Sequence, residues 1–140
     1  MTIKEVVLKV ENRPGELARV VGDLYENDVQ VHAFWVGTEK KKATLRFITS
    51  DPKSAISVLT GLGLKVETSE VIAAEIPDHP GGLNTILKIL QSRDINILHI
   101  YPCLQTQDPV LILEVDKTGE AVTALENSWI RLYDEKLYSM

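Results

Sequence analysis

The alternation of apolar and polar residues divides the first half of the chain into strands and helices. Residues 3–10 alternate between two faces, which predicts a strand. Leu17, Val20 and Leu24 then recur at helical spacing, which predicts a helix ending near residue 27. Further strands are predicted at 29–36, 43–49 and 64–67, and a second helix starts at Asp51-Pro52. The predicted order is βαββαβ.

The second half repeats this order. Its pattern predicts strands at 71–76, 95–104, 110–115 and 130–133, and helices at 81–91 and 118–126. A split βαβ unit gives a four-stranded antiparallel sheet with two helices on one face. The predicted fold class is therefore α+β, with two tandem ferredoxin-like βαββαβ domains at residues 1–68 and 69–140, and Thr68-Ser69 is the expected boundary.

An internal repeat supports this division. The stretch Glu11-Asn12-Arg13-Pro14-Gly15-Glu16-Leu17 returns as Pro77-Asp78-His79-Pro80-Gly81-Gly82-Leu83, at an offset of 80 − 14 = 66 residues. The offset continues to pair apolar residues as far as Leu59 with Leu125, without an insertion. The chain is thus a duplicated domain.

Each copy of the repeated stretch joins a predicted strand to a predicted helix. Pro14 presets φ for a first helical turn, and Gly15 leaves its backbone open to close approach. The first amides of a helix lack internal acceptors, and the positive end of the dipole suits a carboxylate or phosphate. The alternative is that the Pro-Gly pair only turns the chain, with Asn12 and Asp78 as helix caps.

Composition and charge narrow the function classes. A hydrophobic content of 44% and a charged content of 25% are ordinary for a globular protein. The net charge of −5 argues against nucleic acid as a partner, and Lys40-Lys41-Lys42 is interpreted as a hairpin tip instead of a phosphate site. No apolar run is long enough to cross a bilayer. A single cysteine and an N-terminus without a signal-peptide core predict a cytoplasmic protein.

The sequence contains no convincing motif for catalysis, metal binding or cofactor binding. The three histidines, His32, His79 and His99, are interpreted as packing or surface residues, with His32 on the sheet face opposite the helices and His99 on the helix face. His99 and Cys103 could share a metal, yet no second ligand pair has suitable spacing. Neither Pro-Gly turn matches a nucleotide-binding fingerprint. We therefore expect no catalytic residue, metal or cofactor.

Trp35 and Tyr101 are related by the 66-residue offset and are expected at the ends of their strands. Aromatic residues at such positions often close a hydrophobic core. We expect that role for both, in preference to stacking on a ligand.

The first half resembles an ACT domain over residues 7–20 (VLKVENRPGELARV) and again at Asp28-Val29-Gln30-Val31. The second half resembles it less fully, at residues 74–83 (AEIPDHPGGL). The first copy is especially similar to the ACT domains of the acetolactate synthase regulatory subunit and of phosphoglycerate dehydrogenase. Two copies cover nearly all of the chain.

The resemblance implies a sensor of a free amino acid, bound where two ACT domains meet. It places the ligand on the amides after the turn, beside a polar side chain before the turn and another from strand two of a facing domain. The implied ligand-binding residues are Asn12, Arg13, Pro14, Gly15, Glu16, Leu17 and Gln30 in the first copy, and Asp78, His79, Gly81, Gly82, Leu83 and Asn96 in the second. Because Asn12, Arg13 and Glu16 become Asp78, His79 and Gly82, two equivalent sites are not expected.

Two classes of function follow. The first is a non-catalytic regulatory protein that binds an amino acid and transmits its presence to a metabolic enzyme. The second is a regulatory subunit that docks on an amino-acid biosynthetic enzyme without binding a ligand. A small enzyme on a ferredoxin-like scaffold, of the acylphosphatase kind, lacks a catalytic set.

Size and surface pattern predict self-association. Each half, of about 70 residues, is near the size at which one core alone is marginal. The sheet face away from the helices is expected to carry Val7, His32, Phe34, Thr44 and Arg46 in the first half, and Ala73, Leu98, Ile100, Val110 and Ile112 in the second. An apolar face of the second kind favours a homodimer with stacked second-half sheets.

Overall fold

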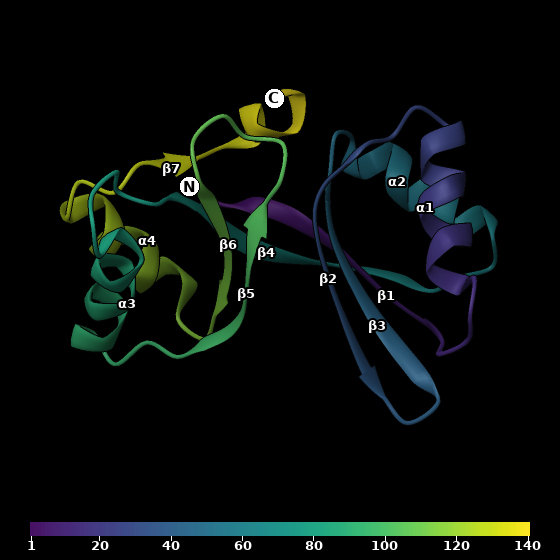
Figure 1. The fold of residues 1–140 in the computed structure, drawn as a ribbon, viewed down its shortest axis with the longest axis horizontal. Coiled ribbons are helices and arrows are strands. Elements are labelled where there is room, and N and C mark those ends of the chain that lie inside the picture. The colour runs from purple at the N-terminus through teal and green to yellow at the C-terminus, as the bar shows by residue number, and fades with distance from the viewer. The chain divides into compact units, whose positions relative to one another are not determined.

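The computed structural model describes residues 1–140, which form two compact units (Figure 1). The N-terminal unit comprises Lys4–Ser69 with Tyr138–Met140, and the C-terminal unit comprises Glu70–Leu137 with Met1–Ile3. Each unit therefore takes a short terminal segment from the far end of the chain. The internal repeat did not predict this exchange of terminal segments, because the residues it pairs do not include the two ends of the chain.

The N-terminal unit follows the predicted βαββαβ order. Its elements are β1 (Ile3–Glu11), α1 (Glu16–Glu26), β2 (Val31–Glu39), β3 (Lys42–Thr49), α2 (Pro52–Gly61) and the first part of β4 (Val66–Glu75). The central strand β3 pairs antiparallel with both β1 and β2, and β1 also pairs with β4. Helices α1 and α2 lie side by side on one face of these strands (Figure 1).

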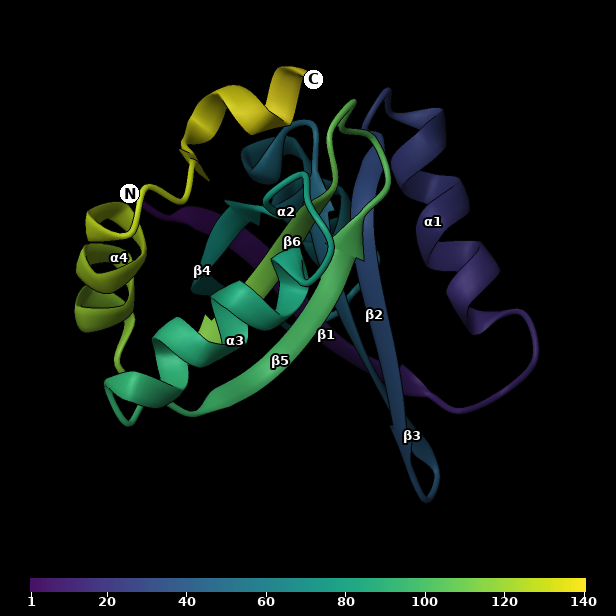
Figure 2. The same cartoon turned by 60° about the vertical axis from the view of Figure 1, so that its left-hand side comes forward.

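The C-terminal unit repeats the arrangement. Its elements are the rest of β4, α3 (Gly82–Ser92), β5 (Ile97–Cys103), β6 (Val110–Val115), α4 (Thr118–Asn127), β7 (Leu132–Tyr133) and part of a short 3₁₀ helix, η1 (Glu135–Ser139), which the sequence pattern did not predict. The strand order is β5-β6-β4-β7, with α3 packed beside α4. Figure 2 shows this helix pair from a second side. The α+β class with two βαββαβ units and four helices is confirmed.

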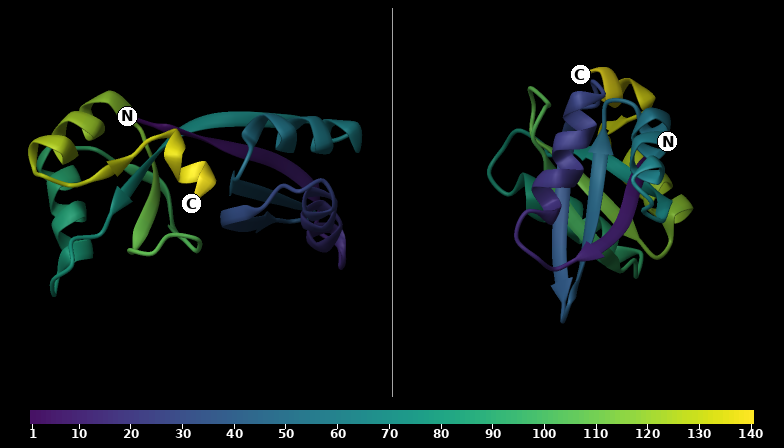
Figure 3. Two further views of the ribbon diagram at one scale, coloured as in Figure 1. Left: turned by 90° about the horizontal axis from the view of Figure 1, so that it is seen from above. Right: turned by 90° about the vertical axis from the view of Figure 1, so that its right-hand side faces the viewer.

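No loop separates the two units at Thr68-Ser69, where the sequence analysis placed their boundary. Residues 66–75 form the single strand β4, drawn without interruption on the left of Figure 3. It serves as the fourth strand of the N-terminal unit and the first strand of the C-terminal unit. The apolar pattern predicted two strands there because Thr68, Ser69 and Glu70 interrupt it. β-Branched and polar residues are nevertheless compatible with an extended strand whose side chains meet water.

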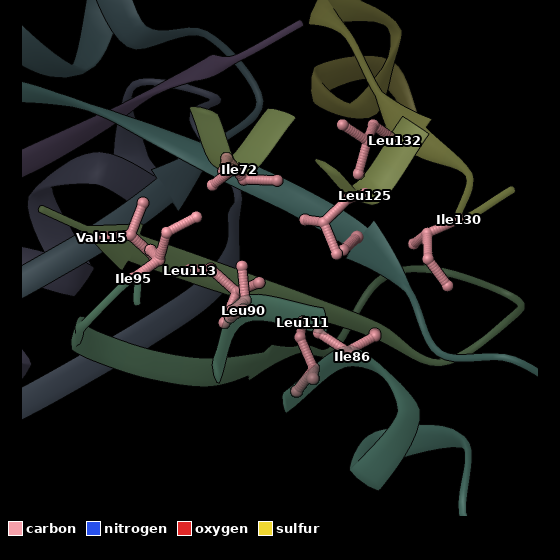
Figure 4. Packing of buried hydrophobic residues seen from close by; sticks show 12 residues of the cluster. Ile72, Ile86, Leu90, Ile95, Leu111, Leu113, Val115, Leu125, Ile130 and Leu132 are labelled. Carbon is pink, nitrogen blue, oxygen red and sulfur yellow. The ribbon is translucent and has the colours of Figure 1, made fainter. Parts of the chain in front are cut away.

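Each unit has its own hydrophobic core between its strands and its helices. In the C-terminal unit, Ile72, Leu111 and Leu113 pack against Ile86 and Leu90 of α3 (Figure 4). The N-terminal core contains the matched residues Val6, Leu45, Phe47, Val20 and Leu24. The period-2 pattern of the strands and the 3.6-residue pattern of the helices therefore identified these cores correctly.

The sheet faces of β2 and β5 differ from the prediction because each strand contains a β-bulge. The register shifts between Val31 and Ala33 in β2, and between Ile97 and His99 in β5. One extra residue reverses the alternation beyond it. Phe34 therefore stands opposite Phe47, and Ile100 opposite Leu113, so both point to the helix face instead of the face predicted for them.

The same bulge overturns the placement of His99. It stands opposite Glu114 and its Nδ1 lies 3.1 Å from Glu114 Oε1, on the face away from the helices. His32 lies within the matching bulge, is buried, and pairs through Nε2 with the Tyr138 backbone oxygen at 2.8 Å. Both histidines have structural partners, in keeping with their interpretation as packing residues.

The apolar face predicted for the second half is only partly available. Leu98 and Ile100 are exposed, whereas Ala73, Val110 and Ile112 are buried. The bulge explains the exposure of Leu98 and Ile100, because Leu98 lies within it and Ile100 stands opposite Leu113, out of line with Val110 and Ile112. The four large side chains therefore do not form one exposed surface.

A buried ion pair joins three strands of the N-terminal unit. Glu5 of β1 is fully buried, and its Oε1 accepts hydrogen bonds from Arg46 Nη1 of β3 and Ser69 Oγ of β4, both at 2.8 Å. Arg46 also lies over the Trp35 ring, 5.8 Å from its centroid. A buried carboxylate needs such partners because it has given up its hydration.

The shared strand predicts one cooperative unfolding transition for the whole chain. Fragment 1–68 lacks Ser69, which donates to Glu5, and Tyr138, whose hydroxyl accepts from the Lys4 amide. Fragment 69–140 lacks Met1–Ile3 of its own unit. In thermal denaturation followed by circular dichroism, each fragment should melt below the full chain, and fragment 1–76, which keeps β4, should melt above 1–68. Fragments 1–68 and 69–140 that each match the full chain would contradict this.

Removing the buried carboxylate should be strongly destabilising. Glu5→Ala leaves the Arg46 charge without its 2.8 Å partner, which should cost roughly 3–5 kcal/mol of unfolding free energy in urea denaturation. Glu11→Ala is the matched control, because it breaks the Lys42 pair in which both side chains are exposed. It should leave the urea midpoint unchanged. Equal losses in the two variants would refute the role of burial.

Candidate functional site

Both Pro-Gly junctions form the same tight turn. Gly15 and Gly81 precede α1 and α3 with φ of 88° and 83°. A residue with a Cβ rarely adopts this left-handed conformation, so the backbone strongly favours glycine at both places. Each turn joins a strand to a helix, as the sequence pattern predicted.

The turns share their hydrogen bonds at the 66-residue offset. In the first, the Arg13 amide donates to the Glu11 carbonyl at 2.9 Å and the Glu16 amide to the Arg13 carbonyl at 3.3 Å. In the second, the His79 amide donates to Pro77 at 2.9 Å and the Gly82 amide to His79 at 3.0 Å. The amides of Glu16 and Gly82, expected to be open to a ligand, are therefore engaged in the turn itself.

Within α1 and α3, the donors without a protein acceptor lie one and two residues further on. They are the amides of Leu17 and Ala18 in the first copy, and those of Leu83 and Asn84 in the second, because the next amides, of Arg19 and Thr85, already bond to Gly15 and Gly81. Ala18 and Asn84 were missed in the sequence analysis. The rule that the first amides of a helix are unpaired would have found them once the helix starts were known.

Neither helix start is capped by a side chain. Asn12 and Asp78, the alternative caps, make no hydrogen bond to the amides of α1 or α3. Asn12 instead holds the turn against the β2–β3 hairpin. Its backbone amide donates to the Lys41 carbonyl at 2.8 Å, and its side-chain Nδ2 donates to the Lys40 carbonyl at 3.4 Å. The capping interpretation is therefore wrong, and the amides stay open.

Charge distinguishes the first turn. Glu16 lies at the first position of α1 and receives hydrogen bonds from Arg19 at 3.0 Å and Arg13 at 3.1 Å. The Arg19 guanidinium, supported by Arg13, lowers the pKa of the Glu16 carboxyl. A carboxylate beside the positive end of the helix dipole is itself favourable. The protein thus already holds one of its own anions near these amides.

The second turn is tighter and carries no such ion pairs. A side chain at Gly82 would collide with the Pro77 carbonyl oxygen, whereas the equivalent position in the first copy accommodates Glu16. His79 Nδ1 lies 2.9 Å from the Pro80 carbonyl, so the ring folds back over its own turn. Asp78 is exposed beside it.

Gln30 and Asn96 lie far from the turns of their own units. The Gln30 amide donates to Ser50 Oγ at 2.9 Å, and the Asn96 amide to Asp116 Oδ1 at 3.0 Å, both beside the ends of β3 and β6. The turn that contains Asn12 lies at the opposite end of β3. The two ends of this strand are roughly 25–30 Å apart. A ligand on one turn could meet such a residue only from a facing domain.

The structure offers no metal centre or membrane helix. No group of three or more His, Cys, Asp or Glu side chains converges on a common point. Burial raises the pKa of the Cys103 thiol, which keeps it protonated. None of the four helices has the length and apolar character needed to span a bilayer.

Comparison with known families decides the class of protein. The family model described as "ACT domain pair" matches residues 1–140. The chain belongs to the ACT domain pair family. No curated protein matches the sequence. The paired turns described above are therefore the helix starts of two ACT domains, and α1 and α3 are the first helix of each.

Solved structures agree on the fold of this ACT domain pair. Protein BT0572 from Bacteroides thetaiotaomicron has a TM-score of 0.91 at 22% identity, covering 100% of this chain and 98% of that chain. The ligand-free regulatory subunit of aspartate kinase from Thermus thermophilus has a TM-score of 0.62 at 15% identity, covering 89% and 90%. A structure of aspartokinase alpha and beta subunits has a TM-score of 0.61 at 17% identity, covering 90% and 91%.

The tightness of the second turn generates a test. Gly→Ala inside a helix normally gains about 0.5–1 kcal/mol, because glycine loses more backbone entropy on folding. Gly82→Ala should instead lower the melting temperature of this ACT domain pair, since the new methyl group meets the Pro77 carbonyl. Glu16→Ala, at the matched position of α1, should be tolerated far better. Differential scanning calorimetry that finds Gly82→Ala stabilising would show that the turn relaxes freely.

Proposed function

We propose that this ACT domain pair is a non-catalytic regulatory protein that binds a free amino acid and transmits its presence to an amino-acid metabolic enzyme. The ligand's carboxylate would accept hydrogen bonds from the Leu17 and Ala18 amides, or from the Leu83 and Asn84 amides. The remaining contacts are expected from Asn12 and Gln30, or from Asp78 and Asn96, across two facing domains.

One observation carries the proposal. Two uncapped helix starts, related by the repeat, each keep two adjacent amides without a protein acceptor. Such amides together with the helix dipole favour an anion. The shared fold with aspartate kinase regulatory subunits supports a regulatory role and an enzyme partner by analogy.

A second candidate is a docking subunit that binds no ligand. The observation in its favour is Glu16, which brings a carboxylate held by Arg13 and Arg19 to the first turn. If that carboxylate fulfils the role of the ligand, the first copy needs none. The second turn has no equivalent residue, so under this alternative it would be the docking surface.

Three finer expectations stay predictions. They are the likeness of the first copy to the acetolactate synthase regulatory subunit and to phosphoglycerate dehydrogenase, the assembly of a homodimer, and the cytoplasmic location. The homodimer prediction now rests on Leu98 and Ile100 alone, because Val110 and Ile112 are buried.

The amino-acid proposal is tested by removing single amides. Titration calorimetry and thermal shift with each of the twenty amino acids should identify a ligand at millimolar concentration or below, because a ligand of the folded state raises stability. Leu17→Pro and Leu83→Pro each delete one unpaired amide without breaking a hydrogen bond of the fold. Loss of a charge-assisted hydrogen bond should weaken binding about 10-fold or more.

The matched controls are Leu17→Ala and Leu83→Ala, which shorten the same side chains and keep the amides. They should bind within about threefold of the unaltered protein, a difference of less than 1 kcal/mol. Response of only one proline variant would assign the ligand to one copy. No heat and no thermal shift with any amino acid would favour the docking subunit.

A further inference from the structure

The N-terminal unit has a charged hollow on the sheet face away from its helices. It measures about 420 Å³ and is lined by Lys9, Glu39, Lys40, Lys41, Lys42 and Thr44. The volume falls within the range of about 300–1,000 Å³ typical of small-molecule sites. The hollow lies where the β2–β3 hairpin, clearly visible in Figure 2, meets β1. The proposed amino-acid site does not use these side chains.

Positive charge dominates this hollow although the chain has a net charge of −5. Lys42 Nζ is paired with Glu11 Oε1 at 2.7 Å, and Glu39 stands opposite Lys42 in the ladder. The ammonium groups of Lys9, Lys40 and Lys41 form no ion pair. Three exposed cations around one hollow favour a ligand with several negative charges, because each exposed pair alone contributes little.

An aromatic surface adjoins these lysines. Lys9, Thr44 and Gly37 form a row across β1, β3 and β2, since Lys9 stands opposite Thr44 and Thr44 opposite Gly37. The six-membered ring of Trp35 lies over Gly37 so closely that a Cβ there would collide with it. The indole therefore covers Gly37, the residue of this row that stands opposite Thr44. Contrary to expectation, Trp35 lies in the middle of β2 and is only partly buried.

The second copy provides a comparison within the same chain. The positions 66 residues after Lys9, Lys40, Lys41 and Lys42 hold Glu75, Thr106, Gln107 and Asp108. The matched residue of Trp35 is Tyr101, which is buried. The backbone pattern is common to both copies, so the basic and aromatic side chains belong to the first copy alone.

We propose that this hollow binds a small molecule that combines a planar ring with two or more phosphates, of the class of a nucleoside diphosphate. The ring lies against the Trp35 indole beside the Arg46 guanidinium, whose carbon is 5.8 Å from the indole centroid. The phosphates reach Lys9, Lys40 and Lys41, with Thr44 between them as a hydroxyl donor. Glu39 disfavours the same phosphates and limits the affinity. Stacking on an aromatic ring combined with cationic contacts is a general way to hold nucleotides.

The test uses ADP as the probe and Trp35 as the reporter. In a Trp129→Phe background, in which Trp35 is the only tryptophan, ADP at low ionic strength should change the indole emission saturably. Trp129 is 94% exposed, so its replacement leaves the core intact. Titration calorimetry on the unaltered protein should give the same affinity. Adenosine and pyrophosphate, which each carry half of the recognised groups, should each bind about tenfold more weakly or worse.

Two double variants separate a site from a general charge effect. K40Q/K41Q should weaken ADP binding about tenfold or more, whereas K53Q/K88Q, which changes the net charge equally on two helices, should leave it within about twofold. Gly37→Ala should alter the emission and weaken ADP, because the indole must move. Far-ultraviolet circular dichroism confirms that each variant is folded.

Three outcomes would overturn the proposal. The first is the absence of a saturable response to millimolar ADP. The second is an equal loss in both double variants, which would indicate only a diffuse electrostatic effect. The third is tighter binding of poly-glutamate than of ADP with the same dependence on Lys40 and Lys41, which would identify the hairpin as a contact for an acidic protein.

Discussion

The left-handed backbone at Gly15 and Gly81 is the constraint on which the rest of the proposed site depends. It turns the chain from a strand into a helix within a few residues and commits the amides of Glu16 and Gly82 to the turn. The next two amides must then point out of the helix end without an acceptor. The possibility of binding an anion is thus a consequence of chain geometry, and side chains only adjust its charge and shape.

The sequence predicted what depends on local patterns. Strand alternation and helical spacing identified the two cores, as Leu24 and Leu90 illustrate, and Asp51-Pro52 marked the start of α2, where Asp51 accepts a hydrogen bond from the Ser54 amide at 3.2 Å. The bulges in β2 and β5 escaped because an inserted residue leaves composition unchanged and alters only the phase of the alternation. His99 was therefore assigned to the wrong face.

The sequence predicted the kind of site, a Pro-Gly turn before a helix, but not which backbone amides of that turn remain open. Recognising the Pro-Gly turn required only two residues, but deciding which amides remain open required the hydrogen bonds of Glu16 and Gly82. The arrangement of Lys9, Thr44 and Gly37 in one row also depended on register, since these residues come from three strands. Properties that arise between strands have no signature along one strand.

The duplicated backbone has kept its special conformations while its side chains diverged. Asp28 and Asp94 both follow their helices with positive φ, of 62° and 57°, and Gly63 is matched by Trp129, with 83° and 63°. Each position allows its helix to end in the same way. The turns likewise keep their hydrogen bonds, although one carries Glu16 and the other Gly82. The two copies can therefore respond to different chemistry on one scaffold.

The shared strand β4 has a consequence for how this chain can change in length. Val66 packs against the N-terminal core, while Ile72 and Ala74 point into the C-terminal core, all from one extended segment. Inserting a single residue between them would turn one of these sets toward the opposite face. The joint between the copies therefore tolerates less variation in length than a surface loop, and the even offset of 66 residues is compatible with the pleat of a strand. In tandem domains that share a strand, the face of the strand that packs into one core therefore fixes the face that packs into the other.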